Sequence, residues 1–129
     1  MTSRFSSLAG MALGLGSVMP VASLAPDPPV HEIRIEARKF EFEPAVIEVT
    51  AGEPVRLVVH SADAAHGFEI KGLTLNLKLP RSGDSVTAEF NAPPPGRYAI
   101  ACSKMCGLGH HKMKAALVSV PVQRPDTTR

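Results

Sequence analysis

Hydrophobic and polar residues alternate over several short stretches of the chain, and turn-forming residues separate these stretches. Between residues 31 and 42, the apolar Ile33, Ile35 and Ala37 alternate with charged residues. A period of two predicts a strand with one buried face. Similar patterns predict further strands over residues 46–49, 55–59, 66–70, 73–79, 85–90, 97–101 and 115–122. Glycine and proline mark turns between them, as in residues 51–54 and 91–96.

The predicted strands indicate an all-β protein. We find no sustained helical period and no internal repeat in the 129 residues, a length suited to one domain. Short strands separated by Gly and Pro turns favour a β-sandwich with Greek-key connections. We expect this domain to cover residues 31–122 and a flexible tail to cover residues 123–129.

The first 24 residues differ in character from the rest. Arg4 supplies a positive charge, residues 8–18 form a short apolar run, and small residues follow around Ser23. This layout is typical of a secretory signal peptide, so we expect a signal over residues 1–24 and a proline-rich linker over residues 25–30. An uncleaved membrane anchor is the alternative, although the apolar run is shorter than the roughly 20 residues of a membrane span. Either reading places the folded domain outside the cytoplasm, in the periplasm.

The charge of the chain argues against nucleic acid as a partner. Lys and Arg number 14 against 12 Asp and Glu, and Arg4 lies in the predicted signal. The remaining domain is nearly neutral and has no dense basic stretch of the kind that binds phosphates.

Residues 102–113, with the sequence CSKMCGLGHHKM, concentrate soft metal-binding side chains. They include both cysteines of the chain, and Met105 and Met113 are the methionines outside the predicted signal. A disulfide between Cys102 and Cys106 is one alternative, but so short a loop would stabilise the fold little. Zinc bound by two cysteines and two histidines is another, although it would leave Met113 without a role.

His66 is the best candidate for a ligand from elsewhere in the chain. It begins a predicted strand directly after a loop, so it can meet the cysteine loop at one end of a sandwich. Two histidines, a thiolate and a weak axial methionine form the donor set of copper electron-transfer sites. The second cysteine extends this set, because two thiolates three residues apart can bridge a pair of copper ions. Each ion would then take one histidine, with Met113 on one ion and a backbone carbonyl on the other.

Two motifs resemble the binuclear CuA cupredoxin domain of cytochrome c oxidase subunit II, a domain that nitrous-oxide reductase also carries. They are His66-Gly67-Phe68 and Cys102-x-x-x-Cys106-Gly107-x-x-His110-x-x-Met113. The similarity continues in residues 40–44, 52–55 and 95–98. It implies a cupredoxin fold and a site with two copper ions. The implied ligands are the bridging Cys102 and Cys106, the capping His66 and His110, the axial Met113, and the carbonyl of Lys104.

The sequence departs from the subunit II family at Lys104. That family usually has glutamate there, whose carboxylate reaches a magnesium ion at the interface with the catalytic subunit. Oxidase subunits of this family receive electrons from cytochrome c through an aromatic patch, whereas this sequence contains no Trp. We also expect no transmembrane hairpin of the subunit II kind. Four lysines are expected near the metal end and suggest an acidic partner: Lys71, Lys104, Lys112 and Lys114.

The resemblance implies an exported electron carrier that passes single electrons between redox proteins, such as a c-type cytochrome and an oxidase-like acceptor. Such a protein has no catalytic residues and catalyses no reaction by itself. A periplasmic carrier that delivers copper for cuproenzyme assembly is the alternative, and a detachable subunit of a terminal oxidase is a third reading. We expect membrane contact only if the N-terminal segment stays uncleaved. His31, His60, His111 and Met105 are expected to lie outside the ligand set.

Overall fold

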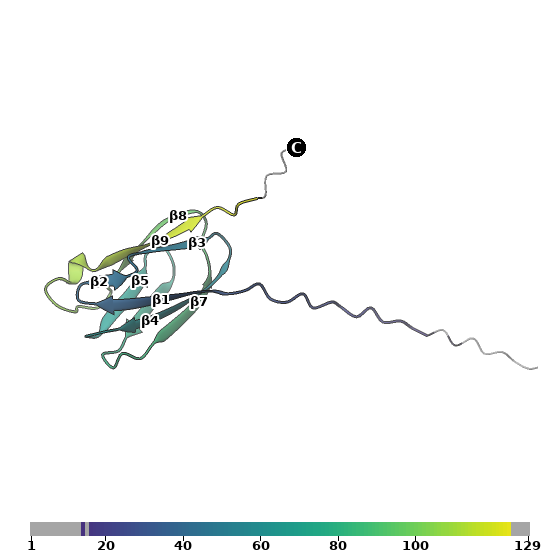
Figure 1. The fold of residues 1–129 in the computed structure, drawn as a ribbon, viewed down its shortest axis with the longest axis horizontal. Helices are drawn as coiled ribbons and strands as arrows, with labels where there is room; N and C mark the ends of the chain where they lie inside the picture. Colours follow the sequence, from purple (N-terminus) through teal and green to yellow (C-terminus); the bar gives the residue numbers. More distant parts are fainter. Residues whose placement is uncertain (1–13, 15, 125–129) are drawn as a thin grey trace, which may run out of the picture.

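Two β-sheets packed face to face form the protein (Figure 1). The structure is a computed structural model that describes residue 14 and residues 16–124. The first sheet has the order β2-β1-β4-β7, formed by Glu41–Glu43, His31–Arg38, Pro54–Ser61 and Val86–Asn91. The second has the order β3-β9-β8-β5-β6, formed by Val46–Thr50, Lys114–Val120, Gly96–Ala101, His66–Ile70 and Leu75–Leu79. Among the described residues, one 3-10 turn, η1 (His110–Lys112), lies between β8 and β9.

Parallel pairing in both sheets brings four loops to one end of the sandwich. Strand β1 runs parallel to β4, with Ala37 opposite Ser61 where the two strands end. β5 starts at this end, with His66 opposite Leu79, the last residue of β6. β8 ends there as well, with Ala101 opposite Lys114. The loops over residues 39–40, 62–65, 80–85 and 102–113 therefore meet at the end that Figure 1 shows opposite the departing N-terminal segment.

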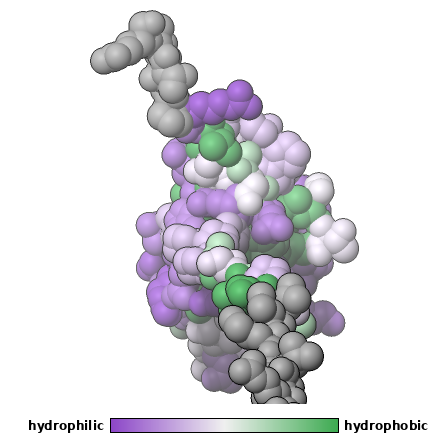
Figure 2. Space-filling model, turned by 90° about the vertical axis from the view of Figure 1, so that its right-hand side faces the viewer, coloured by the Kyte–Doolittle hydropathy of each residue, from purple (hydrophilic) through white to green (hydrophobic). Residues whose placement is uncertain are grey.

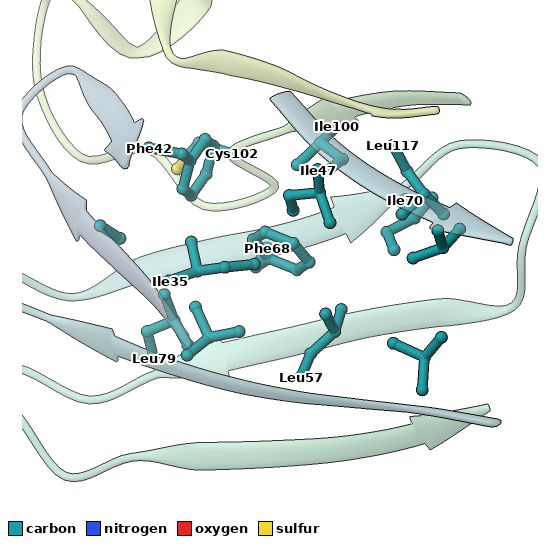
Figure 3. Close-up of a cluster of buried hydrophobic side chains, with 14 of the residues drawn as sticks. Ile35, Phe42, Ile47, Leu57, Phe68, Ile70, Leu79, Ile100, Cys102 and Leu117 are labelled. Carbon is teal, nitrogen blue, oxygen red and sulfur yellow. The ribbon is translucent and has the colours of Figure 1, made fainter. Parts of the chain in front are cut away.

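The alternation seen in the sequence sets which side chains form the core. In β4, Val55, Leu57 and Val59 are fully buried, while most of the residues between them are partly exposed. Figure 3 shows Phe68 among side chains from both sheets. Its ring meets Phe42 edge to face, with the centroids 5.4 Å apart. Edge-to-face contact is a favoured geometry for aromatic rings, so this pair helps to hold the sheets together.

The predicted all-β sandwich is confirmed, with one difference in its first strand. The stretch 31–42 forms two strands, because the chain turns at residues 39–40 and β2 pairs back onto β1 in an antiparallel register. The predicted strand 66–70 is β5, with the same bounds. Leu73 lies in the turn before β6 rather than in the strand itself.

Among the described residues, regular structure begins at His31 and ends at Val120, whereas the predicted domain covers residues 31–122. Residues 16–30 contain no strand or helix and are exposed. Much of the predicted signal peptide, residues 1–13 and 15, lies outside the described residues, as do residues 125–129 of the predicted tail. Within the described part of the chain, no helix has the length and apolarity needed to cross a membrane. The signal peptide, linker and tail therefore stay predictions.

The burial of Leu57 gives a test of the core. Leu57→Ala removes a fully buried side chain between the sheets and is expected to lower the free energy of unfolding by about 2–5 kcal/mol. Leu108→Ala is the matched control, because Leu108 is fully exposed, and it should change this free energy by less than about 0.5 kcal/mol. Urea denaturation of the metal-free protein measures both. Equal effects of the two substitutions would contradict the packing of Leu57 in the core.

Candidate metal centre

The two cysteines lie together as free thiols at the end of β8. Cys102 directly follows this strand, is buried, and belongs to the core cluster (Figure 3). Its backbone N–H donates to the Met113 carbonyl over 3.2 Å, which closes the base of the ligand loop. Cys106 is partly buried, and its sulfur lies 3.6 Å from that of Cys102. The fold therefore presents two sulfur donors side by side.

His110 and Met113 come next to Cys106 through the 3-10 turn η1. The Met113 N–H donates to the His110 carbonyl, which reverses the chain within four residues. The sulfur of Cys106 lies 3.8 Å from His110 Nδ1 and 3.8 Å from Met113 Sδ. Met113 is fully buried, whereas His110 is partly exposed. Three of the predicted ligands thus share one side of the loop.

His66 completes the cluster from the neighbouring strand β5. It is the first residue of that strand and is fully buried, with 0% of its surface exposed. Its Nδ1 atom is buried and has no hydrogen-bond partner among the described residues. The donor atoms of His66, Cys102 and Cys106 all lie within 4.8 Å of one another. A buried nitrogen without a partner is costly, so this arrangement fits a metal ion as the missing partner.

Asp63, which the sequence motifs did not single out, holds the His66 ring in place. His66 Nε2 lies 2.8 Å from the Asp63 carboxylate, whose second oxygen accepts a hydrogen bond from the Lys39 N–H over 2.8 Å. With its proton on Nε2, the ring presents a free lone pair on Nδ1, the arrangement that carboxylates impose on metal-binding histidines. The available signal was the acidic residue three positions before His66 in the predicted loop.

The same hydrogen bonds keep Asp63 ionised. Partial burial by itself would raise the pKa of Asp63, but hydrogen bonds from Lys39, His66 and Ala64 outweigh it and lower the pKa below its usual value. The carboxylate is therefore charged at neutral pH and remains an acceptor for the His66 ring.

Lys104 contributes its backbone to the cluster. Its carbonyl oxygen lies 3.0 Å from the Cys102 sulfur, while the residue as a whole is exposed. The carbonyl of Lys104 thus lies beside the cysteine sulfur, while its role as a ligand stays a prediction.

Two glycines allow the ligand loop to pack closely. A Cβ atom on Gly67 would lie 2.8 Å from the backbone nitrogen of Lys104, so β5 and the loop can approach only without a side chain there. A Cβ atom on Gly109 would lie 2.7 Å from Cε2 of Phe40. The Phe40 ring thus packs on the loop backbone, a contact that strand patterns in the sequence do not reveal.

Burial changes the acidity of Cys106. Burial, followed by the hydrogen bond and charge of Cys102, raises the pKa of the Cys106 thiol to about 11. The thiol is therefore protonated at neutral pH in the metal-free protein, and a metal ion that binds the thiolate must displace this proton.

The remaining histidines lie outside the cluster, as expected. His31 lies 2.8 Å from a carboxylate oxygen of Glu53, and His60 lies 3.4 Å from one of Glu36. His111 is exposed beside His110, and Met105 is 68% exposed.

The expectation for Lys71 is wrong. Lys71 follows β5 at the end opposite His66, roughly 16 Å along the strand, and its ammonium pairs with Glu69 at 2.8 Å. The error arose because sequence proximity to His66 does not reveal the direction in which a strand runs.

The fold and the cluster together define a small β-sandwich with a candidate metal centre in the loops at one end. Comparison with known proteins agrees with this class. Residues 11–118 match the family model described as "Cupredoxin-like domain", and the chain belongs to this family.

The most informative relatives are oxidase subunits. The chain is 34% identical over 92 residues to cytochrome c oxidase subunit 2 of Thermus thermophilus. The match covers 70% of this chain and 67% of the relative. A second sequence of this subunit from the same species is also 34% identical, and the match spans only 54% of its length. These matches confirm the resemblance to subunit II drawn from the sequence.

Solved structures show the same fold. A chain of a heme-copper terminal oxidase dimer aligns with a TM-score of 0.63 and 25% identity, over 70% of this chain and 65% of that one. The periplasmic domain of subunit II of the cytochrome oxidase of Bradyrhizobium japonicum aligns with a TM-score of 0.64 and 17% identity, over 71% and 85%.

The lowered pKa of Asp63 gives a test of its role. A carboxylate with a lowered pKa stabilises the folded state above its unfolded pKa of about 3.9, and this stabilisation is lost as the pH falls through the folded pKa. Asp63→Asn should therefore lower the free energy of unfolding of the metal-free protein by about 1 kcal/mol at pH 7, a value reduced for the partial exposure of Asp63. The deficit should shrink as the pH falls below the unfolded pKa and disappear once the pH lies below the lowered folded pKa. Urea titrations at several pH values measure it.

Asp84→Asn is the control for this test, because Asp84 is exposed and its carboxylate accepts only the hydroxyl of Ser82. It should have little effect at any pH. A deficit of Asp63→Asn that stays constant down to the acid limit would show that the charge of Asp63 is not what holds the loop.

Proposed function

We propose that this protein is an electron carrier with a binuclear copper centre. Its ligands are His66, Cys102, Cys106, His110 and Met113 together with the carbonyl of Lys104. The observation that carries the proposal is the buried His66 Nδ1, which has no hydrogen-bond partner in the described part of the chain and lies close to two free thiols. Soft sulfur donors combined with imidazoles are the donor set that copper prefers.

The surrounding residues suit a site that must not change shape. Asp63 orients His66, Gly67 lets the ligand loop lie on β5, and Phe40 packs on the loop from the other sheet. A pair of copper ions held by these residues would supply a one-electron couple. A scaffold that holds the same donors in place for both redox states keeps the reorganisation small.

The cluster also lies close enough to the surface for transfer between proteins. His66 and Met113 are fully buried, but His110 and Cys106 are only partly buried. An electron can therefore leave through the His110 side without the protein opening. Electron transfer needs no carboxylate pair or other acid–base group. On this proposal the protein is therefore a carrier rather than an enzyme.

The similarity to known proteins supports a class of redox partner. The similarity to cytochrome c oxidase subunit 2 supports transfer between redox proteins, with a c-type cytochrome as donor and an oxidase-like protein as acceptor. The protein would work outside the cytoplasm, exported by the signal peptide over residues 1–24. On this proposal it serves either as a free carrier or as the copper subunit of a terminal oxidase.

A copper carrier for cuproenzyme assembly is the second candidate, and exposed soft ligands favour it. Met105 and His111 lie in the same loop as the cluster, and both are exposed. Such side chains can receive and release copper by ligand exchange, whereas the buried cysteines favour retention.

Reconstitution with copper distinguishes the two candidates. The electron-carrier proposal predicts two copper ions per chain, a purple colour, and an electron paramagnetic resonance spectrum with one unpaired electron shared by two nuclei. Cys106→Ser should abolish the purple spectrum because it removes one bridging thiolate. Ser103→Ala is the control, since the Ser103 hydroxyl donates to Asn76 outside the cluster, and it should leave the spectrum unchanged.

Other spectra would contradict the proposal. A blue spectrum from one copper ion would exclude the binuclear centre, and a colourless Cu(I) protein that readily gives up its metal would favour the copper carrier. Tight binding of zinc with no stable copper form would contradict both candidates.

The two methionines of the loop provide a matched pair. Met113→Leu removes the buried thioether next to Cys106 and should raise the reduction potential, because a donor that stabilises oxidised copper is lost. Met105→Leu changes an exposed side chain of the same size and should leave the potential unchanged. Protein-film voltammetry measures both. If the potential responds to Met105→Leu instead, the assignment of the axial ligand is wrong.

A further inference from the structure

Positive side chains are concentrated at the end of the molecule that holds the candidate metal centre. The four loops at this end carry Lys39, Arg81, Lys104 and Lys112 against Asp63 and Asp84. Lys78 in β6 and Lys114 at the start of β9 add two more, opposite Gly67 and Ala101 in the strand register. The domain as a whole is nearly neutral, so this excess is local.

These six cations differ from most other cations of the sandwich in being unpaired. On the first sheet, Arg34, Arg38 and Arg56 each pair with glutamates, and Lys71 pairs with Glu69. Among the described residues, none of the six cations at the metal end forms an ion pair. Their charge is therefore available to attract an anionic surface.

A pocket of about 620 Å³ lies beside the metal centre within this positive region. Residues of β5, β6 and the start of the ligand loop line it, including His66, Lys78, Lys104 and Met105. Two polar residues of its wall bond to each other, because the Ser103 hydroxyl donates to the Asn76 side chain over 2.7 Å. The charged groups that line the pocket are the ammonium groups of Lys78 and Lys104, with Met105 beside them.

Exposed apolar side chains accompany the charge. Met105 is 68% exposed and Leu108, in the same loop, is fully exposed. The opposite end of the molecule, from which the termini leave, is mainly hydrophilic with small separate apolar patches (Figure 2). Apolar side chains within a charged rim are typical of a protein interaction surface.

We propose that this end is the docking surface for an acidic redox protein. A carboxylate of the partner lies between Lys78 and Lys104, and apolar atoms of the partner contact Met105 and Leu108. This inference rests on the proposed electron-transfer function and names the class of partner. It also places the partner against the wall of the pocket that His66 forms, next to the proposed copper ligands.

The first test measures electron exchange between the copper-loaded chain and two soluble c-type cytochromes, one with an acidic and one with a basic surface, by stopped flow. The rate constant with the acidic cytochrome should exceed that with the basic one by about tenfold or more at low ionic strength and should fall as salt is added. The basic cytochrome should show the opposite trend.

Substitutions locate the surface. The variant Lys78→Ala should slow exchange with the acidic cytochrome about threefold at low salt, with little effect at high salt. Its copper spectrum should stay unchanged, because Lys78 lies in β6 and is not one of the proposed ligands. Lys71→Ala is the control outside the docking surface, because Lys71 lies beside Ala99 in β8 and its ammonium pairs with Glu69, and it should leave the rate constant unchanged.

A second measurement does not depend on copper. Carbodiimide coupling of the metal-free chain to the acidic cytochrome, followed by mass spectrometry, should join carboxylates to Lys78 or Lys104 in preference to Lys71. Equal coupling at all three lysines would overturn the docking surface. Phosphate that slows exchange more than chloride at the same ionic strength would indicate a small-anion site and would also overturn it.

The outcomes separate this inference from the function beneath it. Exchange with both cytochromes that is independent of salt and of the Lys78→Ala substitution would overturn the docking surface while leaving the electron carrier intact. A copper-loaded protein that exchanges electrons with neither cytochrome, nor with a small neutral redox reagent, would contradict the proposed function itself.

Discussion

A buried imidazole nitrogen that faces two thiols is the constraint on which the rest of the site depends. His66 Nδ1 has no partner within the described part of the chain, and burial makes an unsatisfied polar atom expensive. The His66 ring is nevertheless held in this position, because its Nε2 atom bonds to the Asp63 carboxylate. That carboxylate is in turn held by the Lys39 N–H. The free energy lost by burying this atom without a partner is explained if His66 Nδ1 binds a metal ion.

The sandwich turns this local constraint into a complete donor set. β5 and β8 lie next to each other in one sheet, so the strand that begins with His66 borders the strand that leads to Cys102. The turn at residues 39–40 belongs to the other sheet, yet it reaches the site twice, through the Lys39 N–H and the Phe40 ring. Contacts from both sheets therefore hold the ligands, which is how a small domain can keep a metal site rigid.

The unpaired cations lie at the same end of the sandwich as the proposed copper ligands. The loops that carry the proposed ligands also carry unpaired cations and two exposed apolar side chains, while the outer face of the first sheet neutralises its arginines with glutamates. A partner attracted by this charge would arrive where the electron path is shortest. Lys104 takes part in both features. Its carbonyl faces the Cys102 sulfur, and its side chain borders the pocket beside the metal centre.

The sequence by itself determined the strands and most of the proposed ligands. Alternation with a period of two marks the buried face of β4, and the spacing of Cys102, Cys106, His110 and Met113 is a local property of one loop. The hydrogen bond of Asp63 to His66 and the packing of Phe40 on the ligand loop were missed because both depend on tertiary contacts. Lys71 was misplaced because strand direction decides which end of the sandwich a residue reaches. Tertiary structure alone decided these points, since only folding brings segments from both sheets around the candidate metal centre.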